Sequence, residues 1–404
     1  MKFVIIGVGA AGISALQTIR SLDKDSEITM VSKENVPPYS LSSLPFNLSG
    51  EIADKGMSRF DGGFFDAECA EVVIGRVNGL DTDGKRVLFD GGTELPYDRL
   101  LIASGSSPIV PRITGLEKRG VHFMGSISDT WRLRDAALSA NNIVVIGAGF
   151  VGLEAAIALN KLGKEVTVVE MLDRVVPRML DPDMAAIVQK MLESHGIQIR
   201  LGDQVTEVLG EERVAGVKLS KGELECELVV LGIGVRPNIG FVKDSAVKTN
   251  MGIVVDDMMR TTASDVYAAG DVVEATDPLT GKPKIAAIWP NAIEQGRVAG
   301  RNMAGVETRY PGIESVNIIN IFDVPVVALG LTSADVEGAE TIVAKREKTV
   351  RKLLVKDDVA VGLQSIGGVR NLGFVLGLIN KRQKLGSLKN SLLDDRFAYP
   401  VATR

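Results

Sequence analysis

Two stretches of the chain share one pattern, in which a run of β-branched residues leads into glycines. "FVIIGVGAAG" begins at residue 3, and "IVVIGAGFVG" begins at residue 143, an offset of 140 residues. Each continues into a helix-like stretch, "ISALQTIRSL" or "LEAAIALNKLG", and then into a second apolar run, "EITMVS" or "EVTVVE". This order of strand, turn, helix and strand predicts two βαβ units in one chain.

Both segments carry three glycines in the spacing G-x-G-x-x-G. These glycines are Gly7, Gly9 and Gly12 in the first segment and Gly147, Gly149 and Gly152 in the second. We expect the first of each set to allow a tight turn, the second to let a pyrophosphate approach the backbone, and the third to let the helix pack closely. The helix N-terminus then offers unpaired N–H groups to the phosphates. One copy could be a structural turn, but two copies in register predict two dinucleotides.

The end of the second strand usually carries an acid that binds ribose hydroxyls. Glu170 fills this place in the second unit, whereas the first unit has Ser32, with Glu34 close enough to substitute. A carboxylate accepts hydrogen bonds from both ribose hydroxyls of NADH and repels the 2′-phosphate of NADPH. Glu170 therefore favours NADH.

Length and composition narrow the alternatives. At 404 residues the chain predicts two or three domains, and it can bury a core without disulfides or metals. Cys69 and Cys226 are far apart, and His122 and His195 share no motif with them, so we expect no metal site. The net charge of −5 argues against nucleic acid as a partner. We find no membrane-spanning run or signal peptide, and we expect a cytoplasmic protein.

Four further motifs have a recognisable order. They are "LLIASGSSP" (100–108), "VVLGIGVRPN" (229–238), "TTASDVYAAGDVV" (261–273) and "AIWPNAIEQGRVAGRNMAG" (287–305). With the two glycine segments they resemble the two-dinucleotide-binding flavoprotein reductases, or pyridine nucleotide–disulfide oxidoreductase family. The resemblance implies an α/β fold with two Rossmann-like domains, for FAD and NAD, and a smaller α+β C-terminal domain. The implied boundaries are 1–109 and 239–305 for FAD, 110–238 for NAD, and 306–404.

The C-terminal part matches the family less sharply. "NIINIFDVPVVALGLT" predicts strands, "TVRKLLVKDDVAVGLQSIG" a hairpin around "KDD", and "NLGFVLGLINKRQKL" a helix. In relatives this module covers the flavin and often supports dimerisation. The last stretch, "LLDDRFAYPVATR", is short for the family, so a homodimer and a subunit of a larger complex both stay open.

The resemblance also names site residues. Asp271 is expected to hydrogen-bond the FAD ribityl chain. The full set expected at the two dinucleotides is Gly7, Gly9, Ala11, Gly12, Ser32, Lys33, Val77, Ala103, Ser104, Gly105, Asp271, Ala292, Gly147, Gly149, Val151, Gly152, Glu170 and Gly234.

Ser42 and Glu154 are the candidate catalytic residues. Aligning "LPF" with the coenzyme A-disulfide reductase and NADH oxidase branch puts Ser42 where those relatives have a redox cysteine. A serine has no stable thiol-like redox couple, so disulfide chemistry through this position is excluded. The alternative is a hydroxyl that bonds the local turn or the flavin, and an engineered replacement of a cysteine stays open. Glu154 is implied near the nicotinamide and flavin edge, or it is an ordinary helix-surface acid.

The thiol-free branch of the family feeds electron carriers. We therefore expect NADH to reduce FAD, and an acidic electron-carrier protein or an iron–sulfur subunit to take the electrons. Residues 309–404 hold fourteen lysines and arginines against ten acids, and six of these cations lie in "AKREKTVRKLLVK" (344–356). Lys348, Arg351 and Lys352 are expected to attract an acidic carrier, unless this is only a solvated hairpin. A small-molecule oxidase, a disulfide-type reductase variant and an NADH-responsive regulatory flavoprotein stay open.

Overall fold

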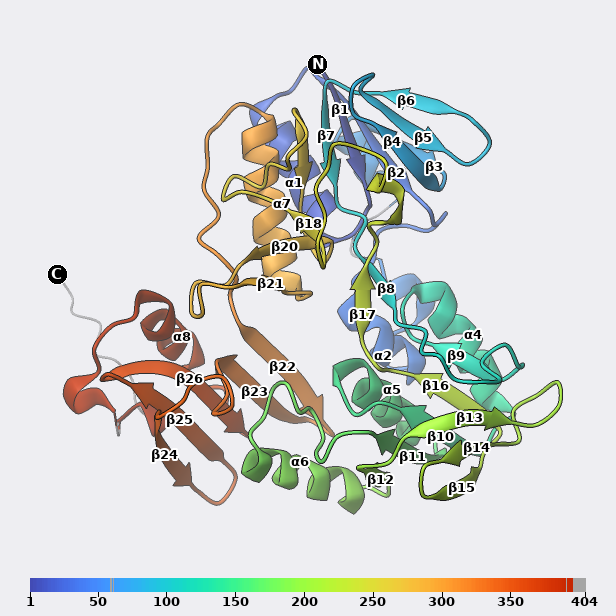
Figure 1. Ribbon diagram of the computed structural model, residues 1–404, viewed down its shortest axis with the longest axis vertical. Helices are drawn as coiled ribbons and strands as arrows, with labels where there is room; N and C mark the ends of the chain where they lie inside the picture. The colour runs from blue at the N-terminus through green and yellow to red at the C-terminus, as the bar shows by residue number, and fades with distance from the viewer. Residues whose placement is uncertain (59, 61, 390, 395–404) are drawn as a thin grey trace. The chain divides into compact units, whose positions relative to one another are not determined.

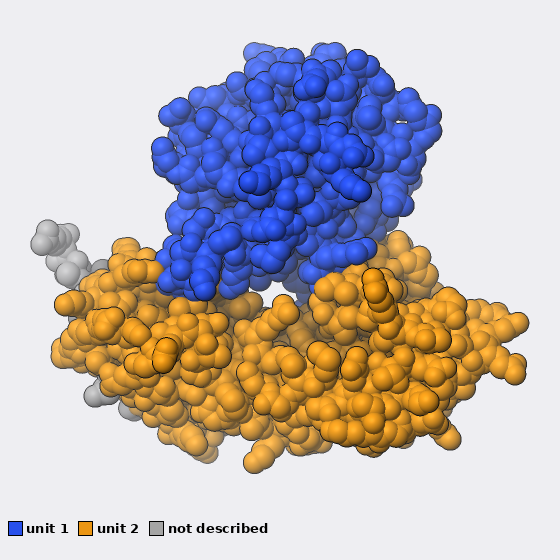
Figure 2. Space-filling model, in the orientation of Figure 1, with its two compact units in different colours: residues 1–47, 52–107, 235–314 blue, residues 48–51, 108–234, 315–404 orange. Residues whose placement is uncertain are grey.

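The computed structural model describes residues 1–58, 60, 62–389 and 391–394. It divides into two compact units (Figure 2). Unit 1 comprises residues 1–47, 52–107 and 235–314, and unit 2 comprises residues 48–51, 108–234 and 315–404. The C-terminal module, residues 315–404, thus belongs to the same compact unit as the second glycine segment. No helix among the described residues is long and apolar enough to cross a membrane.

Unit 1 contains the first predicted βαβ unit. Its main sheet is parallel and has the order β19-β7-β1-β2-β3. The central strand β1 is flanked on both sides, which explains its almost fully buried apolar run. The elements of this layer are β1 (Lys2–Ile6), α1 (Ala10–Leu22), β2 (Glu27–Ser32), β3 (Ala70–Ile74), β7 (Arg99–Ile102) and β19 (Val266–Ala268).

Helix α7 (Trp289–Met303) lies beside α1 in unit 1 (Figure 1). Glycines make the close approach possible, because an added Cβ at Gly296 would lie 2.2 Å from the carbonyl oxygen of Ala11, and one at Gly300 would lie 2.9 Å from that of Ala15. This pairing runs in the same chain direction, so both helices begin at the same end of the unit.

Smaller elements lie mostly in unit 1. The structure has the meander β4 (Val77–Asp81), β5 (Arg86–Phe89) and β6 (Glu94–Pro96), the pair β8 (Ser106–Pro108) and β17 (Val235–Pro237), the sheet β18 (Ile253–Val254), β20 (Val273–Thr276) and β21 (Pro283–Ile285), and the short helices α2 (Leu44–Leu48) and α3 (Phe64–Ala67).

Unit 2 repeats the parallel architecture, with the sheet order β12-β11-β10-β16-β9. Its strands and helices are β9 (Val121–Phe123), α4 (Ile127–Leu138), β10 (Asn142–Ile146), α5 (Phe150–Lys161), β11 (Glu165–Glu170), α6 (Pro182–Ser194), β12 (Gln198–Leu201) and β16 (Leu228–Leu231). An antiparallel sheet accompanies them, formed by β13 (Val205–Leu209), β14 (Gly216–Leu219) and β15 (Gly222–Glu225).

The C-terminal module is a five-stranded antiparallel sheet with the order β22-β23-β26-β25-β24 and the helix α8. Its elements are β22 (Val316–Ile321), β23 (Val324–Gly330), β24 (Glu340–Lys345), β25 (Val350–Lys356), β26 (Val359–Ile366) and α8 (Leu372–Lys381). The predicted hairpin turns at Asp357 and Asp358, both with positive φ, as a two-residue type I′ turn requires. The predicted strands, hairpin and helix are confirmed, as is the fold class. Residues 395–404, which end the short last stretch, lie outside the described residues.

Candidate dinucleotide sites

The first glycine turn, residues 7–9, joins β1 to α1. Gly7 has φ +114°, and an added Cβ there would lie 2.1 Å from the carbonyl oxygen of Ala103. A Cβ at Gly12 would lie 2.0 Å from the carbonyl oxygen of Gly7, whereas one at Gly9 would meet nothing within 4 Å. Packing therefore demands the first and third glycines. The second leaves open backbone at the start of α1, where no side chain caps the helix.

The second glycine turn, residues 147–149, has the same construction. Gly147 has φ +102°, and an added Cβ at Gly152 would lie 1.9 Å from its carbonyl oxygen. The nearest atom to a Cβ at Gly149 would be 4.0 Å away. Sequence reasoning missed Gly232, whose added Cβ would lie 2.5 Å from Cα of Gly152. The visible signal was the "GIG" after β16.

The two strand ends differ. Ser32 is buried, and its hydroxyl donates to the carbonyl oxygen of Glu34 at 2.7 Å and accepts from the N–H of Glu34 at 3.1 Å. The Glu170 carboxylate instead accepts from the N–H groups of Ala148 at 2.7 Å and Leu172 at 2.9 Å. Glu170 thus lies against the glycine turn, while the Ser32 hydroxyl closes its own local turn.

Asp271 lies at the end of a polar cluster in unit 1. The hydroxyl of Ser106 donates to its carboxylate at 2.8 Å. Burial raises the pKa of Asp271 above its ordinary value, and the bond from Ser106 opposes this shift. Asn238 anchors the same serine-rich segment, donating to the carbonyl oxygen of Ser104 at 2.9 Å and accepting from the Ser107 hydroxyl at 2.7 Å. Ser106 and Asn238 lie within two of the family motifs, but sequence reasoning did not predict them as site residues.

The N-terminal ends of α1 and α7 lie next to Gly270 and Asp271. Gly270 has φ +85°, and an added Cβ would lie 3.1 Å from Cβ of Ala11 and 3.8 Å from Cβ of Ala292. The buried side chain of Gln295 accepts from the N–H of Gly270 at 2.8 Å. The structure therefore brings the candidates Ala11, Ala292 and Asp271 together, with Gln295 as a support that sequence reasoning missed.

The other predicted site residues differ in burial and in backbone conformation. Val77 is half-buried in β4, Ala103 is buried after β7, Val151 is half-buried in the first turn of α5, and Lys33 is exposed. Gly105 and Gly234 have φ +65° and +112°, and an added Cβ at Gly234 would meet only the Ile109 side chain, at 3.7 Å. Their contacts with a dinucleotide stay predictions.

Ser42 and Glu154 lie in different compact units. Ser42 is exposed in the 3₁₀ turn Leu41–Ser43, and its hydroxyl makes no hydrogen bond to any described residue. Glu154 is half-buried in α5, and among the described residues it has no hydrogen bond or ion pair. Burial raises the pKa of Glu154 to about 7. A group with this pKa can hold or release a proton near neutral pH.

The two cysteines offer no obvious redox pair. Cys69 is exposed in unit 1, and Cys226 is buried in unit 2, where burial raises the pKa of its thiol to about 12. Across the part of the chain that the structure describes, no group of three or more histidines, cysteines and acids could hold a metal ion.

The expectation that Lys348, Arg351 and Lys352 attract an acidic carrier was wrong for Arg351 and Lys352, which are not at the surface. Arg351 and Lys352 are buried in β25, which is covered along its length. Arg351 donates to the side chain of Asn371 and the carbonyl oxygen of Arg370, both at 2.9 Å, and Lys352 is ion-paired inside the unit. The exposed cations of this segment are Lys345, Arg346 and Lys348 at the β24–β25 turn, and Arg346 pairs with Asp394 at 3.0 Å.

The residues of the two turns fit dinucleotides. Each turn combines a first glycine with positive φ, open backbone at the second glycine and an uncapped helix start, which together suit a pyrophosphate. The Asp271 carboxylate can accept hydrogen bonds from polyol hydroxyls, and Glu170 can accept them from a ribose. A bound flavin would supply the acceptance of a hydride and the release of single electrons, which these side chains cannot perform.

Comparisons with known proteins agree with this geometry. The family model described as "Pyridine nucleotide-disulphide oxidoreductase" matches residues 1–296. An "NADH oxidase" of Methanocaldococcus jannaschii is 32% identical over 92% of this chain and 88% of its own length. The "NADH-dependent phenylglyoxylate dehydrogenase subunit epsilon" of Aromatoleum evansii is 32% identical over 98% of this chain and 96% of its own. The solved NAD-dependent persulfide reductase from A. fulgidus is 30% identical with a TM-score of 0.92, covering 99% of this chain and 80% of that one.

Proposed function

Because the chain belongs to the pyridine nucleotide-disulphide oxidoreductase family, we propose that it passes electrons from NADH through FAD to a redox protein or an iron–sulfur partner subunit, without an enzyme thiol. Family membership makes it an oxidoreductase of the flavoprotein class. The proposal goes further in naming the acceptor class and the absence of a thiol. The observation that carries it is Ser42, which stands where a redox cysteine is expected and whose hydroxyl has no partner among the described residues.

The two cysteines support a thiol-free reaction. A thiolate is the reactive form of cysteine, and a pKa of about 12 keeps Cys226 protonated at neutral pH. Cys69 is exposed but occurs in none of the motifs that build the two turns. Neither residue repeats the position at which the thiol-dependent branch carries its cysteine.

We assign FAD to the first glycine turn with Asp271, and NADH to the second turn with Glu170. The preference for NADH over NADPH is part of the proposal. It is supported by the position of the Glu170 carboxylate, which accepts from the N–H of Ala148 within the second turn. A 2′-phosphate near this carboxylate would meet a like charge.

The acceptor is supported by relatives and by charge. One relative of nearly the same length is named as a subunit of an NADH-dependent dehydrogenase, which is compatible with delivery to a partner subunit. The exposed cations Lys345, Arg346 and Lys348 could steer an acidic carrier, because complementary charge raises association rates.

An anaerobic titration with NADH tests the proposal. We expect reduction to stop at the two-electron flavin level, with no thiolate-to-flavin charge-transfer band. Ferricyanide, rubredoxin or an iron–sulfur protein should reoxidise the enzyme quickly, and coenzyme A disulfide slowly. Ser42→Ala should keep ferricyanide turnover within about tenfold, because at most one hydrogen bond changes. Ser42→Cys is the matched control, since it supplies a thiol at the same position. A charge-transfer band in the wild type, or loss of turnover with every acceptor in Ser42→Ala, would overturn the proposal.

A second candidate, a small-molecule oxidase, is favoured by the NADH oxidase relative. Reoxidation by oxygen separates the two, because an oxidase should turn over with oxygen faster than with any protein carrier. Slow reoxidation by every acceptor would instead indicate a regulatory flavoprotein.

A further inference from the structure

Residues 171–180 connect β11 to α6 and lie against the second glycine turn. Immediately before this loop, at the end of β11, the Glu170 carboxylate accepts from the N–H of Ala148 at 2.7 Å. In the middle of the loop, the N–H of Val176 donates to the carbonyl oxygen of Ala148 at 2.8 Å. Both backbone polar groups of Ala148 are therefore bonded by Glu170 and the loop that follows it.

The loop holds this position at a conformational cost. Val176 has φ +40° and is almost fully buried. A β-branched residue is rarely found at positive φ, because its side chain crowds the backbone. Such strain persists only where the surrounding structure over-determines the conformation. The contacts at the far end of the loop are therefore important.

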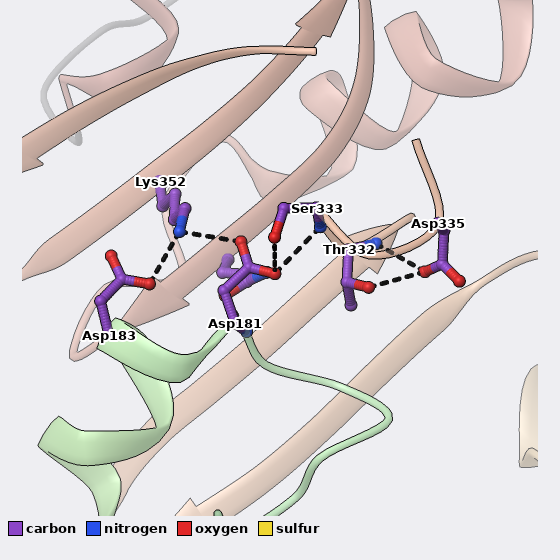
Figure 3. A network of polar contacts seen from close by, with 7 residues as sticks. Asp181, Asp183, Thr332, Ser333, Asp335 and Lys352 are labelled. Carbon is purple, nitrogen blue, oxygen red and sulfur yellow. Dashed lines mark hydrogen bonds and ion pairs between the residues drawn. The ribbon is translucent and has the colours of Figure 1, made fainter. Parts of the chain in front are cut away.

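Asp181 directly follows the loop and is 2% exposed. It occupies the N-cap position of α6, yet its side chain makes no capping bond to that helix. The carboxylate instead accepts from the N–H of Ser333 at 2.9 Å and from its hydroxyl at 2.7 Å, and it pairs with the Nζ of Lys352 at 2.8 Å (Figure 3). The N–H of Asp181 donates to the side chain of Gln364 at 3.0 Å.

All three partners of Asp181 come from the C-terminal module. Burial alone would raise the pKa of Asp181, but the bonds from Lys352 and Ser333 outweigh it and hold the pKa below its ordinary value. Lys352 also pairs with Asp183 at 2.7 Å, so the buried cation faces two carboxylates. The carboxylate of Asp181 is therefore ionised and fixed in place at neutral pH.

The other end of α6 touches the same module through a different contact. The rings of His195 and Phe322 stack with centroids 3.9 Å apart and planes 5° from parallel. This contact lies beyond the last turn of α6, thirteen residues from Pro182 along the helix, and does not involve the loop. It provides a matched control for the role of Asp181.

We propose that Asp181 is a positioning residue for dinucleotide binding, through which Lys352, Ser333 and Gln364 of the C-terminal module hold the 171–180 loop and Glu170 against the second glycine turn. The inference rests on the proposed binding of NADH at that turn. Without the clamp, the strained loop would populate other conformations. Because only the fraction of protein in the competent conformation binds, the apparent affinity for the nucleotide would be the intrinsic affinity multiplied by that fraction.

Asp181→Asn and Ser333→Ala in the full-length, FAD-loaded protein test the inference. Asparagine keeps an acceptor for Ser333 but loses the ion pair, and Ser333→Ala removes only the hydroxyl bond. We expect the Kd for NAD⁺, measured by calorimetry, to rise about five- to tenfold in Asp181→Asn and about two- to threefold in Ser333→Ala. The KM for NADH with ferricyanide should rise similarly, with kcat and the affinity for FAD nearly unchanged.

His195→Leu serves as the control, because it removes the stack at the other end of α6. It should lower the melting temperature without changing the Kd for NAD⁺. A merely structural role of Asp181 predicts the same behaviour for Asp181→Asn, and that result would overturn the inference. If Asp181→Asn does not fold, an unchanged Kd in Ser333→Ala overturns it, and a raised one supports it. A wild type that binds no NAD⁺ would instead refute the proposed function.

Discussion

The two glycine turns have nearly the same backbone and different side chains around it. Gly7 and Gly147 have φ values of +114° and +102°, and an added Cβ at Gly12 or Gly152 would lie 2.0 or 1.9 Å from the carbonyl oxygen of that first glycine. The positions offset by 140 residues then diverge. Where the second βαβ unit has Glu154, the first has Ser14, at the same offset of 140 residues. Where the second unit ends its second strand with Glu170, the first ends its second strand with Ser32.

This difference separates the residues that the turn requires from the residues that vary between the two units. The glycines are demanded by chain packing, so they produce the same turn in both units. The acids Glu154 and Glu170 have no counterpart in the first βαβ unit, and in unit 1 burial raises the pKa of Asp271, which is distant in sequence and accepts from the Ser106 hydroxyl.

The largest expected effect is the difference in stability between substitutions at Gly7 and Gly9, two glycines of the same turn. Gly7→Ala should lower the free energy of unfolding by about 3 kcal/mol or more, because it combines positive φ with a clash against a carbonyl oxygen. Gly9→Ala should change it by less than about 0.5 kcal/mol in the flavin-free protein, since nothing lies near its Cβ. Its affinity for FAD should nevertheless fall, because the pyrophosphate needs that space. Urea unfolding and FAD titration check both results, and equal destabilisation by the two variants would contradict the contrast.

Glu154 should make the free energy of unfolding depend on pH, whereas Ser14, at the corresponding position of the first βαβ unit, should not. Since burial raises its pKa from 4.5 to about 7, Glu154 contributes stability that is fully present below about pH 4.5 and lost as the pH rises through about 7. Glu154→Gln should therefore gain up to about 2–3 kcal/mol relative to wild type between about pH 5 and pH 8. Urea unfolding across this range tests it, with Ser14→Ala as the control. Parallel pH curves for wild type and Glu154→Gln would show that the carboxyl is not buried in solution.

Glu170 should control the choice of nucleotide. Losing the ribose contacts and gaining charge repulsion should disfavour NADPH by about 1–3 kcal/mol, a roughly 5- to 150-fold preference for NADH. Glu170→Gln removes the charge and should reduce this preference, as measured by anaerobic stopped-flow reduction. The affinity for FAD should stay unchanged in Glu170→Gln, whereas Asp271→Ala should weaken it. Equal or faster reduction of the wild type by NADPH would overturn the assignment.

The smallest effect is expected at Ser32. Its hydroxyl already bonds the backbone of Glu34, so Ser32→Ala should cost about 0.5–1.5 kcal/mol of stability. The affinity for FAD should change little, because the turn does not leave this hydroxyl free for a ribose. A large loss of FAD affinity without a loss of stability would instead establish Ser32 as a direct ribose ligand.

The sequence by itself determined the elements whose causes are local. The β-branched runs and glycines of the repeat are contiguous, and they specify two strand–turn–helix units without help from the rest of the chain. The sequence also predicted the turn at Asp357 and Asp358, because two short polar residues between apolar strands suit positive φ. The family motifs in addition predicted the fold class and the expected cofactors.

Only the tertiary structure decided which polar residues are partners. Strand periodicity tells which side chains share a face, but not whether that face is covered, so Arg351 and Lys352 were expected on the surface and are buried. Ser106 and Asp271 are 165 residues apart, and Lys352 and Asp183 are 169 apart. A buried polar or charged side chain needs a hydrogen-bonding or oppositely charged partner, and the chain can supply it from any distance along the sequence. The identity of that partner therefore depends on which strands and helices the fold brings together.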